Sequence, residues 1–353
     1  MFGNRVKTIV FSIAGFASLS FAMQSAAIIS PAARMISLSE TKYFKNWAAG
    51  CDNVLSCQAI ALRPVDVPDG YLSLVITRDG KKSSAISSVE LLDFDTDAAG
   101  YKILADDKLV TAGVFESGKD SITLKGAVAA KVVRAVAAAK EFRITDDAGK
   151  LLGRISPNGA AAALKYLDGR QRRSGKQAAA KTLPQIPVKS IKPTEIIPET
   201  SDLIALAESS ICVSERSGVT EDSAYSLGNQ DGKPAALALI SCGNGAYNFS
   251  SVAFIGTRGE DKKWKFVPAI FNYISDDPLM RNSRKKLTNA TWNPAKQNLN
   301  SYYKGRVIAD CGETEDFVWD GYAFRLTRAE RMKECQGSPV WITVWRAAVE
   351  FAS

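Results

Sequence analysis

The chain has 353 residues, with six cysteines, no histidine and a formal net charge of +8. The absence of histidine excludes Ser-His-Asp and Cys-His nucleophilic catalysis, His-ligated metal centres and a histidine general base. An enzyme built from this chain would depend on paired carboxylates, on Ser-Lys chemistry or on Tyr and Arg. The sequence names no such reaction, and we favour a protein that is not an enzyme.

Residues 1–27 have the pattern of a cleavable signal peptide. Arg5 and Lys7 form a short basic start, and an apolar stretch follows at residues 9–22. Small residues ending at Ala22 and at Ala27 offer two cleavage sites. An uncleaved inner-membrane anchor is the alternative, because the uncharged span 8–33 is long enough to cross a bilayer. We expect a periplasmic protein.

The positive charge is concentrated in a short segment, residues 170–200. Seven basic and two acidic residues give this segment +5, whereas residues 34–169 carry +1 and residues 201–353 carry 0. Its prolines favour an extended spacer, so we predict a basic, Pro-rich linker between two domains. Such a linker could make a weak contact with an anionic envelope surface. We expect no nucleic acid partner, because no aromatic residue interleaves the basic ones. The first basic residues of the linker are Arg170, Arg172, Arg173, Lys176 and Lys181.

The first half, residues 34–169, changes its pattern along the chain. Short apolar runs bounded by Asp, Gly and Pro predict strands at residues 57–62, 71–78, 88–94 and 109–115. Helical spacing predicts a helix at residues 127–140. A hairpin around Asp147-Ala148-Gly149 and a helix at 159–167, capped by Ser156 or Asn158, follow. This order indicates an α+β domain with a mainly antiparallel sheet and one or two helices.

The second half, residues 201–353, is predicted to be a mainly antiparallel β domain. An opening helix is predicted at residues 202–209. Asp320-Gly321 predicts a two-residue hairpin turn. Most of the tryptophans in this half are expected in its core. The predicted strands are residues 235–241, 247–256, 264–271, 298–307, 315–319 and 322–328.

The six cysteines predict disulfides, because an exported chain folds in an oxidising compartment. Locality and the division into halves favour Cys51–Cys57, Cys212–Cys242 and Cys311–Cys335, although six cysteines allow 15 connectivities. A zinc site and a redox-active dithiol are both disfavoured, because no C-x-x-C motif is present. We expect no metal and no cofactor.

An acidic hairpin is the main candidate surface of the second half. Its acids could protect the edge of an exposed strand, or they could form a cation or sugar site. The candidate surface residues are Glu313, Glu315, Asp316, Trp319, Asp320 and Arg346.

Asp93, Asp95 and Asp97 resemble the start of a calcium loop, but the later positions of that loop do not fit, so a solvated strand end is favoured.

Ordered motifs link the chain to a known family. They include Gly245-Ala246-Tyr247-Asn248, Asp310-Cys311-Gly312, Trp319-Asp320-Gly321 and Trp345-Arg346-Ala347. By these motifs the chain resembles the bacterial family called domain of unknown function 1176. The first half, with Cys51-Asp52 and Cys57, is also loosely similar to the invasion-associated locus B proteins. The resemblance implies a Gram-negative periplasmic protein with no assigned activity, so no catalytic residue is implied.

Three functions remain compatible with the sequence. The first is a non-catalytic binding or interaction module of the cell envelope, with an envelope protein or a glycan as its partner. The second is a histidine-free glycan hydrolase that uses paired carboxylates. The third is a structural or stress-related factor tethered near a membrane by the linker.

Overall fold

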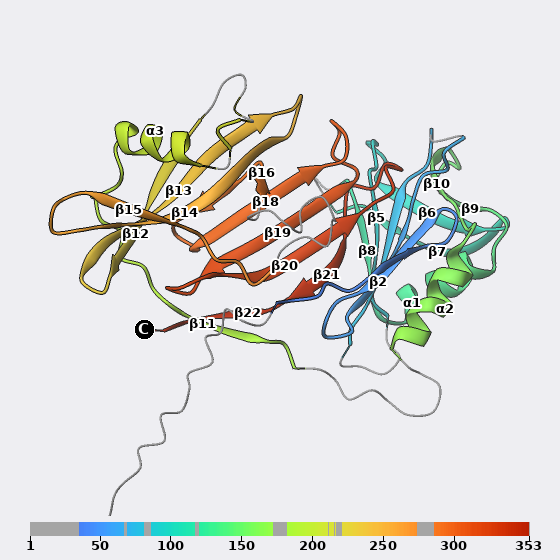
Figure 1. Cartoon of the computed structure of the whole chain (residues 1–353). Helices are drawn as coiled ribbons and strands as arrows, with labels where there is room; N and C mark the ends of the chain where they lie inside the picture. Colours follow the sequence, from blue (N-terminus) through green and yellow to red (C-terminus); the bar gives the residue numbers. More distant parts are fainter. Residues whose placement is uncertain are drawn as a thin grey trace, which may run out of the picture.

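The computed structural model describes residues 35–66, 69–80, 86–116, 120–171, 182–210, 212–214, 216, 221–273 and 286–352. These residues form five β-sheets and three helices (Figure 1). The predicted signal peptide lies outside the described residues. None of the three described helices has both the length and the apolar character required to span a bilayer.

Two antiparallel sheets and two helices, α1 (Gly126–Ala138) and α2 (Ala160–Arg170), form the first half. The six-stranded sheet has the order β1 (Thr41–Tyr43), β2 (Trp47–Cys51), β3 (Cys57–Ala61), β4 (Ser73–Arg78), β5 (Ile86–Leu92) and β8 (Ile122–Leu124). The four-stranded sheet has the order β10 (Leu151–Ile155), β9 (Phe142–Thr145), β6 (Gly100–Ala105) and β7 (Lys108–Val114).

The six-stranded sheet is buried on both faces at its centre. All residues of β2 are buried, and successive side chains point to opposite faces of a strand. Trp47 and Ala49 therefore enter the core of the first half, where Val132 and Val136 of α1 also lie. Ala48 points the other way, into a core shared with the second half. Because both faces of β2 are buried, its sequence has no alternation of apolar and polar residues.

The second half is a sandwich of two antiparallel sheets covered by helix α3 (Thr200–Ser209). The β12 sheet has the order β12 (Ser223–Gln230), β13 (Lys233–Asn244), β14 (Phe249–Arg258) and β15 (Trp264–Pro268), and β16 (Lys286–Thr288) also pairs with β14. The β19 sheet has the order β17 (Thr291–Asn293), β18 (Asn298–Lys304), β19 (Gly312–Trp319), β20 (Phe324–Met332) and β21 (Ile342–Arg346).

Aromatic residues fill the space between the two sheets. Phe271 stacks on Phe324 and meets Phe317 edge-on, with ring centroids 5.1 Å apart in both pairs. On the outer face of the β12 sheet, Leu203 and Leu206 of α3 form a smaller separate core. The tryptophans expected in the core are mainly there: Trp292, Trp319 and Trp341 are buried, and Trp264 and Trp345 are half-buried.

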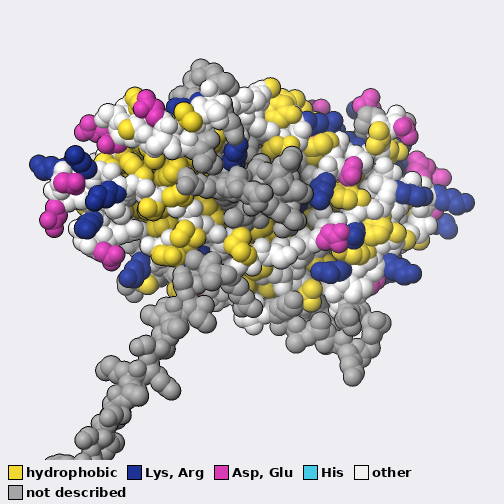
Figure 2. All heavy atoms as spheres, viewed as in Figure 1, with side chains coloured by type: hydrophobic (Ala, Val, Ile, Leu, Met, Phe, Trp, Pro, Cys, Tyr) yellow, Lys and Arg dark blue, Asp and Glu magenta, His cyan; other side chains and the backbone are white. Residues whose placement is uncertain are grey.

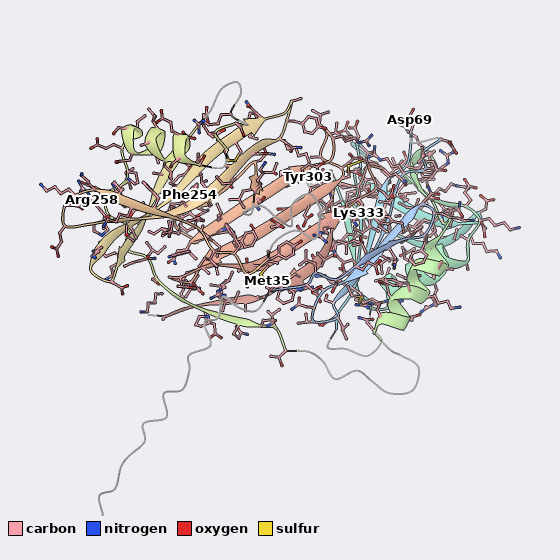
Figure 3. All side chains as sticks on the ribbon, viewed as in Figure 1. Met35, Asp69, Phe254, Arg258, Tyr303 and Lys333 are labelled. Atoms are coloured by element: carbon pink, nitrogen blue, oxygen red, sulfur yellow. A yellow bond between two sulfur atoms is a disulfide. The ribbon has the colours of Figure 1, made fainter. Side chains whose placement is uncertain are left out.

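The two halves pack directly against each other through β2, β3 and β21 (Figure 1). Ala48 and Ile60 of the first half share a core with Ile342 of the second. Gly50 makes this approach possible, because a Cβ there would lie 2.7 Å from Cγ2 of Ile342. At the same boundary, the backbone N–H of Lys333 donates to the hydroxyl of Tyr43 at 2.7 Å (Figure 3).

The structure describes the C-terminal part of the predicted linker. Arg170 ends α2, and Arg172, Arg173, Lys176 and Lys181 lie outside the described residues. Strand β11 (Gln185–Lys189) then pairs in parallel with β22 (Ala348–Ala352), and Val188 is buried. The predicted extended conformation is therefore present, held as a strand beside the second half.

The fold class and the disulfides agree with the sequence-based predictions. The chain is α+β and mainly antiparallel, with β11–β22 as the parallel strand pair among the described elements. Disulfides join Cys51 to Cys57, Cys212 to Cys242 and Cys311 to Cys335, which confirms the predicted pairing. The third of these closes the open end of the β19–β20 hairpin.

Two local predictions are wrong. The β19–β20 turn contains residues 320–323 rather than two residues, because the carboxylate of Asp320 accepts the N–H groups of Tyr322 and Ala323. The N-cap of α2 is Gly159, with φ of 107°, and no side chain caps it. Ser156 instead donates from Oγ to Asn46 Oδ1 at 3.2 Å, so it holds the turn between β1 and β2.

Candidate functional site

A pocket of about 400 Å³ lies where the C-terminal part of the linker meets the two sheets of the second half. Residues 189–192, the β12–β13 turn and the β19–β20 turn surround it. Small-molecule sites have volumes of roughly 300–1,000 Å³. We call it the linker pocket; it is lined by Lys189, Ser190, Ile191, Lys192, Leu227, Asn229, Gln230, Asp231, Trp319 and Gly321.

Hydrogen bonds to the backbone fix the linker wall of this pocket. Gln297 is buried, and its Nε2 donates to the carbonyl oxygen of Lys189 at 3.0 Å. Its Oε1 accepts the N–H of Ile191 at 2.6 Å. Three residues after Ile191, the N–H of Thr194 donates to Ser226 Oγ at 2.9 Å. The linker wall is thus pre-formed, which lowers the ordering cost of binding.

The two turns that complete the pocket are also held in place. Asp231 and Gly232 have φ of 50° and 78°, as a tight hairpin turn with two positive φ values requires. Gln230 donates from Nε2 to the carbonyl oxygen of Gly321 at 3.3 Å and so connects the two turns. Trp319 lies beneath them and packs on Phe324, with ring centroids 5.0 Å apart.

The lining of the linker pocket is polar and carries both charges. Lys189 and Lys192 are the basic residues of the lining, and neither has an ion-pair partner among the described residues. Asn229 and Gln230 contribute amides, and Asp231 contributes the carboxylate. Amides bind hydroxyl groups and ammonium groups bind anions, so this lining suits a small, hydroxylated anion.

The predicted candidate surface does not form one surface. Glu313 and Glu315 lie on the face of β19 that carries the core residue Phe317, whereas Asp316 points to the opposite face. Trp319 is 3% exposed and belongs to the core as well as to the wall of the pocket. The interpretation of these acids as edge protection is wrong, because β19 lies between β18 and β20.

Glu313 takes part in a half-buried charged cluster. Arg331, opposite it on β20, donates from Nη2 to Glu313 Oε1 at 2.6 Å and also hydrogen bonds to the hydroxyl of Tyr273. Burial works against the charge of Arg331, but Glu313 outweighs it and raises the pKa of the guanidinium. Tyr303 lies beside Glu313 on the other neighbouring strand, near the end of β18 (Figure 3). The charge of Glu313 is therefore compensated within the protein.

The other two acids of the predicted hairpin have structural partners. Asp316 Oδ1 accepts the side-chain amides of Asn298 at 3.1 Å and Asn300 at 3.0 Å. Asp320 pairs with Arg325 at 2.5 Å and orders its own turn. Both carboxylates therefore stabilise the β19 sheet locally.

Arg346 connects the two halves rather than the acidic hairpin. It forms an ion pair with Asp52, whose side chain is 0% exposed. Asn53 holds the same strand end, since its side chain accepts the N–H of Arg346 at 2.8 Å and donates to its carbonyl oxygen at 3.0 Å. Burial raises the pKa of Asp52, although Arg346 and the N–H groups of Val54 and Ser56 act in the opposite direction.

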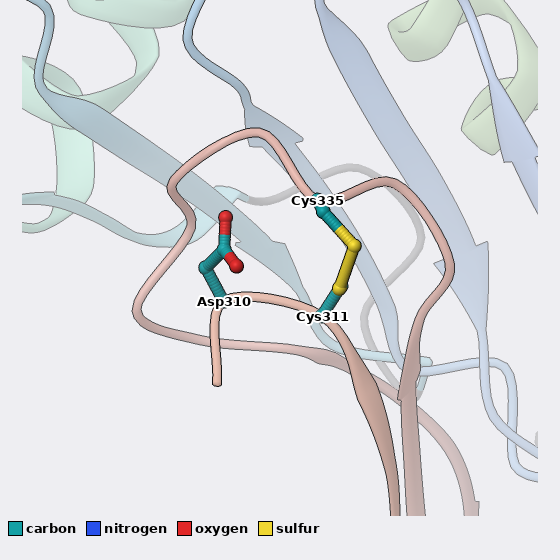
Figure 4. Close-up of side chains that lie close together, drawn as sticks. All are labelled: Asp310, Cys311 and Cys335. Carbon is teal, nitrogen blue, oxygen red and sulfur yellow. A yellow bond between two sulfur atoms is a disulfide. The ribbon is translucent and has the colours of Figure 1, made fainter. Parts of the chain in front are cut away.

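One group among the described residues brings metal-type ligand atoms together: Asp310, Cys311 and Cys335, whose ligand atoms lie within 4.8 Å of one another (Figure 4). The two sulfurs are bonded to each other. Asp310 is engaged by Arg306 at 2.6 Å and by the N–H of Gly337 at 2.6 Å. These contacts lower the pKa of Asp310 although its burial acts to raise it. This group is a cross-linked loop anchor, not a free ligand set.

Of the basic linker residues singled out in the sequence, only Arg170 is described, and it lies at the end of α2. Lys189 and Lys192 belong to the same basic segment but were not singled out, and they line the pocket. No local signal separates them from the other linker lysines. Asp93, at the start of the calcium-like sequence, forms an ion pair with Arg63 at 3.3 Å.

The sequence of the chain matches the model of a known protein family. The sequence model described as protein of unknown function (DUF1176) matches residues 41–348, which is most of the chain. The chain belongs to the DUF1176 family. The looser similarity to invasion-associated locus B proteins stays a prediction.

One curated relative of this DUF1176 chain is the uncharacterized protein YpfG of Escherichia coli (strain K12). The two are 26% identical over 211 residues, covering 54% of this chain and 59% of the relative. The chain therefore spans less than two thirds of that relative's length. No solved structure matches this DUF1176 chain.

Proposed function

We propose that this DUF1176 protein is an exported, non-catalytic binding module that holds an acidic sugar of the cell envelope in the linker pocket. The observation that carries the proposal is the linker pocket itself. Its lining includes two lysines without ion-pair partners among the described residues, two residues with side-chain amides, and a buried tryptophan. Amides suit sugar hydroxyls, and the ammonium groups suit a carboxylate or phosphate on the sugar.

The three disulfides support export, because such bonds persist in oxidising compartments such as the periplasm. On the face shown in Figure 2, acidic and basic side chains are interspersed over both ends of the molecule. This distribution favours a local binding site over a long-range electrostatic one.

Export predicts a mature N-terminus after Ala22 or Ala27, which intact mass measurement of the native protein would detect. A full-length mass would contradict cleavage.

Binding is favoured over hydrolysis by the composition of the described pockets. A glycosidase needs two carboxyl groups about 5–9 Å apart around its substrate. Asp231 is the carboxylate that lines the linker pocket, and Glu313 is neutralised by Arg331 outside it. The glycan hydrolase is therefore second to the binding module, and the membrane-tethered structural factor stays a third candidate.

The test compares two sugars that differ by one acidic group, N-acetylmuramic acid and N-acetylglucosamine. We expect isothermal titration to show binding of the first and much weaker binding of the second, because the lactyl carboxylate meets the lysines. Lys192→Ala should weaken N-acetylmuramic acid binding by about 2- to 5-fold, as loss of one exposed ion pair implies. Lys265→Ala, on the exposed edge strand β15, is the matched control and should change nothing.

Equal binding of both sugars, or equal loss in both variants, would contradict the proposed site. Release of sugar from a chitooligosaccharide, abolished by Glu313→Gln, would instead favour the hydrolase.

We also propose that the basic stretch of the linker makes a weak contact with anionic envelope surfaces. Binding to phosphatidylglycerol vesicles should disappear by about 0.3 M salt, where the Debye length is about 6 Å. It should be lost when the basic residues are replaced with Ser, with an unchanged melting temperature. Salt-resistant binding would contradict this contact. The residues to replace are Arg170, Arg172, Arg173, Lys176 and Lys181.

A further inference from the structure

A second, larger pocket of about 750 Å³ lies in the first half, away from the linker pocket. It is bounded by the β1–β2 turn, the end of α1 and the start of α2. We call it the helical pocket; it is lined by Phe44, Lys45, Ala139, Lys140, Pro157, Asn158, Gly159, Ala161 and Ala162.

Hydrogen bonds hold the walls of the helical pocket together. The N–H of Asn46 donates to the carbonyl oxygen of Asn158 at 3.1 Å, which fixes the β1–β2 turn on the segment before α2. The indole of Trp47 donates to the carbonyl oxygen of Ser156 at 2.8 Å. Gly159 allows the close approach of this turn, because a Cβ there would lie 1.8 Å from the carbonyl oxygen of Phe44. The pocket is therefore pre-formed.

The charge in the helical pocket is positive. Lys45 and Lys140 line it, and no acidic residue does. Neither ammonium group has an ion-pair partner among the described residues. Asp106, whose charge interacts with that of Lys140, accepts the backbone N–H groups of Lys140 and Glu141 at 2.9 Å. That carboxylate is thus held by the backbone and does not line the pocket.

The remainder of the lining is mainly apolar. Phe44 is partly buried and packs against Tyr166, with ring centroids 5.7 Å apart. Ala139, Pro157 and the first turn of α2 add small apolar surfaces without filling the space. An apolar cavity with two positive charges at its walls is complementary to a ligand with an apolar body and an acidic head.

We infer that the helical pocket binds a small amphiphilic anion, with its carboxylate or phosphate between Lys45 and Lys140 and its chain against Phe44. The inference is independent of the linker pocket, which is polar and belongs to the other half. The probes are octanoate, octyl phosphate and the neutral octanol, titrated into the mature protein by calorimetry. Both anions are expected to bind about tenfold more tightly than octanol, since two partly exposed ion pairs together contribute about one decade in affinity.

Three variants separate the charge and the cavity from general effects. Lys45→Ala/Lys140→Ala should reduce octanoate affinity to that of octanol. Lys131→Ala/Lys165→Ala removes the same charge from exposed positions on α1 and α2, the two helices that border the pocket, and should leave octanoate binding unchanged. Ala162→Phe adds bulk to the pocket wall and should abolish binding of all three probes. Thermal unfolding should show that each variant remains folded.

The source of the anion is distinguished by a vesicle arm. This arm uses the chain with its five basic linker residues replaced with Ser, so that the linker contributes no vesicle binding. Sedimentation of that chain with phosphatidylglycerol vesicles that is lost on adding Lys45→Ala/Lys140→Ala would assign the site to a lipid headgroup. Binding of octanoate without vesicle binding would assign it to a free amphiphile. The inference is overturned if octanol binds as tightly as octanoate, or if octanoate binding survives both Lys45→Ala/Lys140→Ala and Ala162→Phe.

Discussion

At the residue scale, Asp52 lies in an environment that disfavours the ionised form of its carboxyl group. Its burial raises its pKa in the folded state, whereas an Asp in an unfolded chain titrates near 3.9. Between these two pKa values the folded state binds more protons than the unfolded state. The contribution of Asp52 to stability therefore falls as the pH rises through that window.

Asp52→Asn should remove this dependence while keeping the side-chain oxygen that accepts the N–H groups of Val54 at 2.9 Å and Ser56 at 2.8 Å. We expect the free energy of unfolding of the wild type, minus that of the variant, to decrease from about pH 4 upward. Urea unfolding at a series of pH values measures this difference. The exposed Asp66→Asn is the control, and a difference that increases with pH would contradict the raised pKa.

At the scale of elements, the contact between β2 and β21 depends on a glycine. Gly50→Ala would place a Cβ 2.7 Å from Ile342 Cγ2 and 3.3 Å from Thr41 Cγ2. Overpacking of this kind costs about 1–3 kcal/mol, so we expect that loss in the free energy of unfolding.

Gly169→Ala is the matched control, because it adds the same methyl group where no atom lies within 4 Å. Position 169 is within α2, so this change should stabilise the protein by about 0.5–1 kcal/mol. Both values come from chemical denaturation. Equal effects of the two substitutions would show that β21 does not pack closely on β2.

The disulfide at the base of the β19–β20 hairpin should contribute strongly to stability. Its ends are 24 residues apart, and closing a loop of this length stabilises a fold by about 2–4 kcal/mol. Cys311→Ala/Cys335→Ala should lower the free energy of unfolding by that amount. A loss below about 1 kcal/mol would show that the β-ladder alone holds the open end of the hairpin.

At the scale of the whole molecule, limited proteolysis tests how the halves are joined. The basic linker predicts first tryptic cuts between residues 170 and 198, and the paired strand β11 restricts them to residues 170–181. Because Ala48, Ile60 and Ile342 share one core, the two fragments should elute together in native gel filtration. First cuts inside either half, or separation of the fragments, would contradict this arrangement.

Much of this architecture was predictable from the sequence because its determinants are local. Residue spacing was sufficient for the cysteine pairs, for α1 and for the β9–β10 hairpin. Asp231-Gly232 is a two-residue hairpin signal that joins β12 to β13. It could have revealed β12, which the sequence analysis did not predict. The strands β1, β8, β16 and β17 have three residues each, which is too few to show the alternation of apolar and polar residues that predicts a strand.

The pockets could not be predicted, because distant segments meet there. The linker pocket combines Lys189, Asp231 and Trp319 from three separate elements, and the helical pocket combines Lys45 with Lys140 and Asn158. The pairing of β11 with β22 was equally hidden, since Pro187 in β11 argues against a strand when the segment is considered alone. Tertiary contacts, not local preference, determine these features.

The β11–β22 pair also sets an order of events during synthesis. The ribosome makes β22 only after the whole second half, so β11 has no partner until then. Pairing between segments so far apart in the chain is slow to form. Val188 is buried by this late step, and Lys189, the last residue of β11, lies in the wall of the linker pocket. A nascent chain therefore leaves Val188 without its cover until synthesis reaches β22, although Gln297 is made earlier and can already hold the linker wall of the pocket.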